Sequence, residues 1–125
     1  MSPGNMLQNP EIAAHFERLG AHSDVSSEVL SAVKKLGEYE VRYGSSDYPA
    51  LYVVTRNIVF CGASGMSSTF WRLRPSDVDI ALRAGADRTG LGPEWVEFSL
   101  YQLGWPKLDL PHWALRAYDF ARTGK

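Results

Sequence analysis

The one cysteine of the chain, Cys61, stands directly before a Gly-Ala-Ser-Gly segment, residues 62–65. A nucleophilic thiol needs a depressed pKa and a base beside it. His15, His22 and His112 are all distant from Cys61 in sequence, and no motif places any of them. The glycine segment lacks the Lys-Ser/Thr of a phosphate-binding loop and is most simply a hairpin turn. We therefore interpret Cys61 as a small buried strand residue and predict no catalytic residues and no enzymatic activity.

Metal-ligand spacing is also missing. Glu11 lies four residues before His15, which on a helix favours a solvated side-chain contact over a metal site. Asp77, Asp79 and Asp87 form the only acidic cluster, but they lack the ligand spacing of a calcium loop. We predict neither a metal ion nor any other cofactor.

One strand pattern places Phe70, Arg72 and Arg74 on the same side. Arginines interleaved with an aromatic ring on a sheet can stack single-stranded bases, and Arg42 and Arg56 would extend such a surface. The charge balance, 13 Lys and Arg against 14 Asp and Glu, gives a nucleic-acid partner no further support. The same strand surface could instead be solvated or face a partner chain.

A second candidate site is a pocket for a small molecule. Its lining would come from four large aromatic side chains, Tyr52, Trp71, Trp95 and Trp105. Aromatic residues also build cores, so their presence alone does not locate a pocket. Quenching of tryptophan fluorescence by a ligand would distinguish the two interpretations.

The elements that must position these residues are centred on an antiparallel meander. Three β-branched and aromatic runs, residues 51–55, 58–63 and 69–73, are separated by Arg56-Asn57 and by a Gly/Ser segment. Arg56-Asn57 indicates a tight hairpin. Strict alternation predicts a further strand over residues 38–43 with Tyr39, Val41 and Tyr43 on one face, and residues 95–101 predict an edge strand.

Helices flank this sheet on both sides in the sequence. Asn9-Pro10 predicts the start of a helix that Gly20 ends, and Ser23-Asp24 caps a second helix before Gly37. Pro75-Ser76 and Asp109 begin two more. The expected fold is α+β, with about five antiparallel strands covered by N-terminal and C-terminal helices. Residues 9–125 would form a single domain after a flexible lead-in, residues 1–8.

The composition is that of an ordinary globular protein, with 45% hydrophobic and 22% charged residues among 125. A single cysteine excludes an internal disulfide and gives no sign of an oxidising compartment. The N-terminus lacks the pattern of a secretory signal, and no apolar run is long enough to span a bilayer. We expect a cytoplasmic protein without a membrane partner.

Both faces of the runs 51–55 and 58–63 are apolar. Such strands are either central and covered by helices on both sides, or covered on one side by helices and on the other by a partner chain. The second alternative makes a homodimer the simplest partner.

The order of these elements resembles the N-terminal domain of the TfoX competence-regulator family. The likeness covers roughly residues 29–122 and rests on the strand 38–42, the hairpin around Arg56-Asn57, the strand 95–101 and the closing Trp113-x-x-x-Ala117-x-x-x-Ala121 helix. The MmcQ/YjbR proteins are more distantly similar. The resemblance implies a bacterial regulatory or accessory module that acts through protein contacts without catalysis. A nucleic-acid-binding module and a small-ligand-binding protein remain the alternatives.

Overall fold

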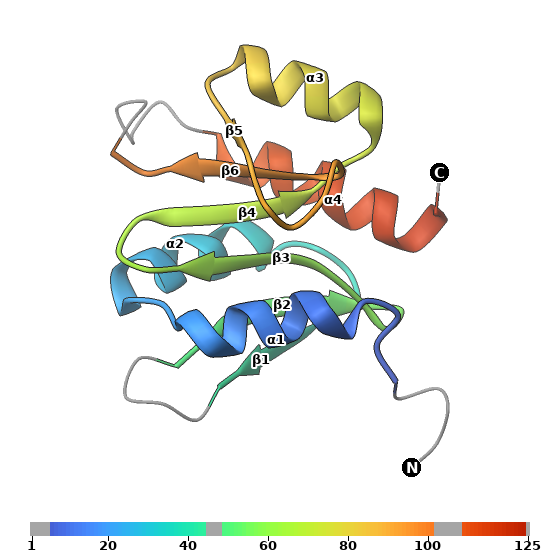
Figure 1. Cartoon of the computed structure of the whole chain (residues 1–125). Helices are drawn as coiled ribbons and strands as arrows, with labels where there is room; N and C mark the ends of the chain where they lie inside the picture. The colour runs from blue at the N-terminus through green and yellow to red at the C-terminus, as the bar shows by residue number, and fades with distance from the viewer. Residues whose placement is uncertain (1–5, 45–48, 102–108, 125) are drawn as a thin grey trace.

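The computed structural model describes residues 6–44, 49–101 and 109–124, which form one α+β domain (Figure 1). The predicted fold class is confirmed, with six strands in place of about five. The elements in chain order are α1 Pro10–Leu19, α2 Ser23–Val33, β1 Glu40–Tyr43, β2 Leu51–Thr55, β3 Ile58–Ser64, β4 Ser68–Arg72, α3 Pro75–Arg83, β5 Asp87–Arg88, β6 Trp95–Ser99 and α4 Leu110–Thr123. None of these described helices combines the length and the apolar character that crossing a membrane requires.

The six strands form one antiparallel sheet in the order β1-β2-β3-β4-β6-β5. The tight hairpin between β2 and β3 is confirmed: Arg56 and Asn57 both have positive φ, 51° and 65°. This pair of left-handed residues matches the twist of the two strands it joins. The expected edge strand at residues 95–101 is wrong in its position, since β6 lies between β4 and β5. β5 has only two residues, too few to produce an alternating pattern.

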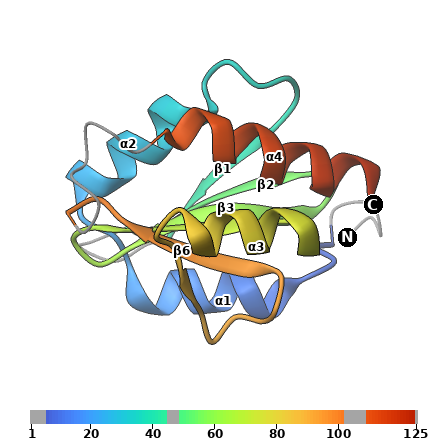
Figure 2. The same cartoon turned by 90° about the horizontal axis from the view of Figure 1, so that it is seen from above.

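Helices cover both faces of the sheet (Figure 2). On one face, α2 and α4 pack over a large cluster that includes Phe60, Trp71 and Phe98. On the other, α1 packs over a smaller cluster that includes Phe16 and Tyr52. The apolar faces of β2 and β3 are therefore buried within the chain. A partner chain is not needed to cover them, so the observation behind the expected homodimer no longer supports it.

α1 is tied to the sheet at both ends. The predicted start is confirmed, with Asn9 as the N-cap residue and Pro10 as the first helical residue, but the Asn9 side chain makes no bond to the helix. Instead its amide donates to the Val59 carbonyl at 3.0 Å and accepts from the Val59 amide at 2.9 Å. At the other end, Gly65 donates to the Gly20 carbonyl and His22 donates to the Gly65 carbonyl. Leu7, expected in the lead-in, already packs against the α1-side cluster.

Two other local predictions are corrected by the structure. The cap of α2 is His22, whose Nδ1 accepts from the Asp24 amide at 3.1 Å, where Ser23-Asp24 was expected. Residues 62–64 continue β3 and do not form the expected turn. The glycine at position 62 is explained by packing: a Cβ there would lie 2.7 Å from Cζ of Phe16. α1 can approach β3 this closely only because Gly62 has no side chain.

Candidate functional site

Phe70 does not offer a stacking surface for bases. Only 7% of the residue is exposed, and its ring meets the edge of the Phe16 ring at 5.5 Å between centroids. His15, also on α1, lies beside the same ring at 6.4 Å. Because α1 covers this face of β4, a nucleotide cannot reach the ring in this structure.

Arg72 and Arg74 are engaged with other parts of the chain. Nε of Arg72 donates to Oε2 of Glu94 at 2.8 Å, and its guanidinium lies 4.3 Å from the centre of the Phe120 ring. Arg74, expected on the same strand, lies beyond the end of β4 as the N-cap residue of α3, and it forms an ion pair with Asp119 at 2.9 Å. Both arginines thus connect the end of β4 to α4, a structural role that needs no ligand.

The other two candidate arginines lie apart from these. Arg42 is on β1, separated from β4 by β2 and β3, and its Nε pairs with Glu40 at 2.6 Å. Arg56 lies in the β2–β3 turn and donates to the carbonyl of Arg122 at 3.1 Å. The five predicted ligand or nucleic-acid residues therefore do not form one site.

The predicted aromatic pocket is also divided. Tyr52 and Trp95 belong to the α1-side cluster. Trp71 lies on the opposite face, fully buried, where its Nε1 donates to the Thr69 hydroxyl at 2.9 Å. The sheet therefore separates Trp71 from the other two. Trp105 lies outside the described residues.

One hollow does involve two of the predicted residues. It encloses about 380 Å³ beside the start of α1 and is lined by Arg72, Glu94 and Trp95, with Asn9 and Glu11 from the N-terminal side. Within the described residues, Nη1 of Arg72 is the one buried side-chain nitrogen or oxygen without a hydrogen-bond partner. We call this space the Arg72 hollow. Sequence patterns could not reveal it, because its lining comes from segments far apart in the chain.

The described residues contain no group of three His, Cys, Asp or Glu side chains that could hold a metal ion. Cys61 is completely buried between the sheet and the α2–α4 layer. This burial raises the pKa of its thiol well above its usual value of 9.0.

The raised pKa of Cys61 predicts an inert thiol. We expect no reaction with a thiol reagent at about pH 8 in the folded protein and complete reaction in denaturant. The unfolded thiol ionises near 9.0 while the folded thiol stays protonated, so the free energy of unfolding should fall as pH rises past that value. Urea unfolding of the wild type and Cys61→Ala, at neutral pH and at about pH 10, measures this loss. An equal loss in both proteins would contradict it.

β1 has a free outer edge. It is the first strand of the sheet, and β2 is its only neighbour among the described strands (Figure 1). The Gly44 amide donates to the Ala50 carbonyl, so the backbone of Gly44 points toward β2. Since backbone direction alternates along a strand, Glu40 and Arg42 also point toward β2, whereas Val41 and Tyr43 present their N–H and C=O groups outward.

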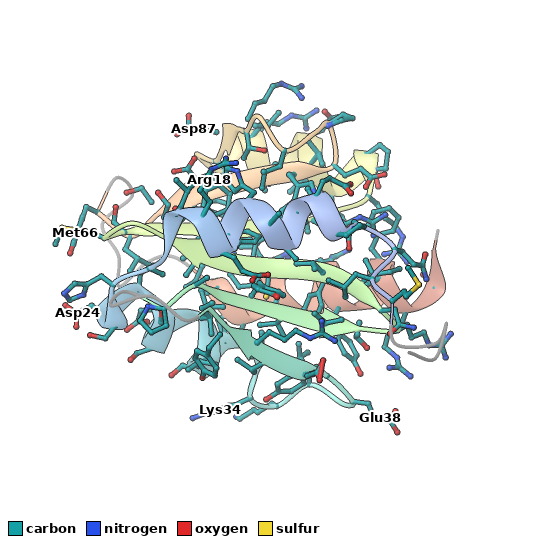
Figure 3. The ribbon with its side chains drawn as sticks, turned by 60° about the horizontal axis from the view of Figure 1, so that its bottom comes forward. Arg18, Asp24, Lys34, Glu38, Met66 and Asp87 are labelled. Carbon is teal, nitrogen blue, oxygen red and sulfur yellow. The ribbon has the colours of Figure 1, made fainter. Side chains whose placement is uncertain are left out.

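Among the residues that the structure describes, the surroundings of this edge leave it open. Tyr43 is 59% exposed, and Figure 3 shows Glu38 beside the beginning of β1 at the rim of the sheet. The opposite edge, β5, is only two residues long. We call the outward backbone groups of residues 41 and 43 the β1 edge. They are the most extended set of unpaired strand groups in the part of the chain described.

Comparisons of the chain with protein-family models, with curated proteins and with solved structures each found no match.

Proposed function

We propose that this chain is a non-enzymatic regulatory or accessory module that acts by binding another protein chain at the β1 edge. The observation that carries the proposal is the free edge itself. Outward N–H and C=O groups on an edge strand accept an additional strand through regular backbone hydrogen bonds. The other long strands are paired on both sides, so the β1 edge is where the sheet can grow.

Two further points support an interaction role. The residues proposed from sequence for ligand binding are largely engaged in internal packing and ion pairs. The resemblance to the TfoX N-terminal domain implies protein contacts as well. Membership of that family, a bacterial origin and a cytoplasmic location stay predictions.

A proline at position 43 tests the proposal. Tyr43→Pro removes an outward N–H and places a ring where a partner strand would lie, while the bonds from β1 to β2 remain. Tyr43→Ala keeps the N–H and is the matched control. Native mass spectrometry and sedimentation velocity should show an assembly, with itself or with a co-purified protein, for the wild type, a weaker one for Tyr43→Ala, which loses only side-chain contacts, and none for Tyr43→Pro. A wild-type protein that is a bare monomer at every concentration would exclude the proposal.

A second candidate function is binding of a small molecule in the Arg72 hollow. Arg72 lines the hollow, and its buried Nη1 has no hydrogen-bond partner. A rotation of the guanidinium toward the hollow would let a ligand acceptor recover the cost of an unsatisfied N–H, about 1–3 kcal/mol. The ligand class would be a small carboxylate or carbonyl compound. Its acceptor would meet the guanidinium while its apolar part lies along the wall that Trp95 contributes.

Fluorescence titration with a panel of small carboxylates tests the second candidate. Because Trp95 lines the hollow, binding should change the tryptophan emission saturably. Arg72→Gln should lose the response, and Trp95→Phe should reduce its amplitude while keeping binding detectable by calorimetry. No saturable change with any member of the panel at millimolar concentration would exclude this ligand class.

A further inference from the structure

We infer that the partner at the β1 edge is a second copy of this chain, paired antiparallel with β1 about a two-fold axis that passes through Val41. The inference rests on the proposed function and names its partner. In this arrangement each residue i of β1 lies opposite residue 82 − i of the second copy, and the two sheets become one continuous sheet.

The direction of the backbone groups permits this register. The carbonyl of Glu38 points inward, toward β2, since it accepts from the Thr55 and Tyr118 hydroxyls. The backbone N–H and C=O groups of Val41 and Tyr43 point outward. Pairing Val41 with Val41 of the second copy therefore joins two outward residues, which can exchange both N–H···O bonds as an antiparallel hydrogen-bonded pair does.

The charges on β1 are self-complementary in this register. Glu40 comes to lie opposite Arg42 of the second copy, and the two-fold axis repeats the pair. These are non-hydrogen-bonded pairs, in which facing side chains are closest and opposite charges attract. A shift of two residues would instead place Glu40 opposite Glu40 or Arg42 opposite Arg42. Within one chain, Arg42 already pairs with Glu40 at 2.6 Å, but the two side chains are 32% and 59% exposed and can be shared with the second copy.

Charged residues on an edge strand usually discourage pairing with other chains. β1 carries one acidic and one basic residue, so its charges sum to zero. They favour the one register in which opposite charges face each other, and they do not prevent pairing with a second copy altogether. On the other face of the strand, Tyr39 and Val41 pack beside the α2–α4 cluster. The exposed Tyr43 would be covered there by Tyr39 of the second copy, an aromatic cross-strand pair.

The contact between the two β1 strands is short, so we expect the dimer to be weak. A strand of four residues buries less than the standard interface of stable complexes. We therefore expect a dimer with a dissociation constant on the order of micromolar, populated in a concentration-dependent manner.

Complementary charge reversal tests the register. Glu40→Arg places two Arg–Arg pairs across the axis, and Arg42→Glu places two Glu–Glu pairs there, so each variant alone should dimerise at least about tenfold more weakly. Mixed in equal amounts, the two variants should form a heterodimer, since every cross-strand pair is then opposite in charge. Sedimentation velocity measures the strength, and native mass spectrometry identifies the heterodimer by its mass.

The double variant Glu40→Arg with Arg42→Glu is the control for folding, because it keeps the net charge and restores the complementarity within one chain. It should dimerise like the wild type, and circular dichroism should show the same fold for all variants. Single variants that dimerise normally, or a mixture that stays monomeric, would overturn the register. If the wild type does not dimerise but binds a different protein, and only Tyr43→Pro loses that protein, the homodimer would be excluded while the proposed function would be supported. A bare monomer without a partner would remove both.

Discussion

Phe16→Ala should lower the free energy of unfolding by about 3–5 kcal/mol, the range expected when a completely buried aromatic side chain is removed. Phe16 is completely buried and is the central side chain of the α1-side cluster. Its ring lies within 5.5–6.3 Å, between centroids, of the rings of Tyr52, Phe70 and Trp95. Alanine would leave a cavity among rigid aromatic groups, which cannot collapse to fill it.

Urea unfolding followed by circular dichroism measures this loss. Leu19→Ala is the matched control, because Leu19 lies on the same helix with 51% of its surface exposed and should change stability by less than about 0.5 kcal/mol. Hydrogen exchange separates two ways of losing stability: α1 detaching alone, or the whole domain unfolding. If Phe16→Ala and Leu19→Ala cost the same, Phe16 is not the anchor of α1.

Much of the fold could be predicted because the patterns are local. The hairpin at Arg56-Asn57, the helix that begins at Pro10 and the alternation of Tyr39, Val41 and Tyr43 each depend on residues close in sequence. The structure confirms the hairpin and the helix. It also places Tyr39 and Val41 on the same side, beside the α2–α4 cluster. Periodicity alone does not reveal which residues of a helix face are covered: Ile12, Phe16 and Leu19 recur at helical spacing, yet Leu19 is exposed.

The candidate sites depend on contacts between distant segments, which local patterns cannot supply. Alternation correctly places Phe70 and Arg72 on the same strand, yet only the packing of α1 shows that Phe70 is covered. The link that holds α1 there joins Asn9 to Val59, fifty residues apart. Arg72 likewise pairs with Glu94, which lies 22 residues later in the chain. No sequence pattern indicates that its Nη1 lacks a hydrogen-bond partner.

The β1 edge could not be predicted from the sequence for a related reason. The sequence indicates a strand with one polar face, but strand order decides whether that strand is internal or at the border of the sheet. Once the strand order is known, Glu40 and Arg42 become candidates for contact with another chain as well as with solvent, because they lie on an edge strand.

Gly62→Ala should lower the free energy of unfolding by about 1–3 kcal/mol, although alanine is the better strand residue by about 0.5–1 kcal/mol. The added Cβ would lie 2.7–2.8 Å from three atoms of the Phe16 ring, closer than real Cβ atoms approach their neighbours. A ring held by Tyr52 and Trp95 cannot turn aside, so α1 must move away from β3 and strain its bonds at both ends. The clash therefore outweighs the gain in strand propensity.

A double-mutant cycle isolates the cause. Gly90→Ala is the matched control, because a Cβ there meets nothing within 4 Å, and it should be nearly neutral. In the Phe16→Ala background, Gly62→Ala should cost nothing or stabilise the protein, since the ring that opposes the new methyl group is gone. Urea unfolding of the four proteins gives the coupling energy. A cost for Gly62→Ala that is the same with and without the ring would show that Gly62 is required by its backbone alone, and that its contact with Phe16 does not determine how closely α1 packs on the sheet.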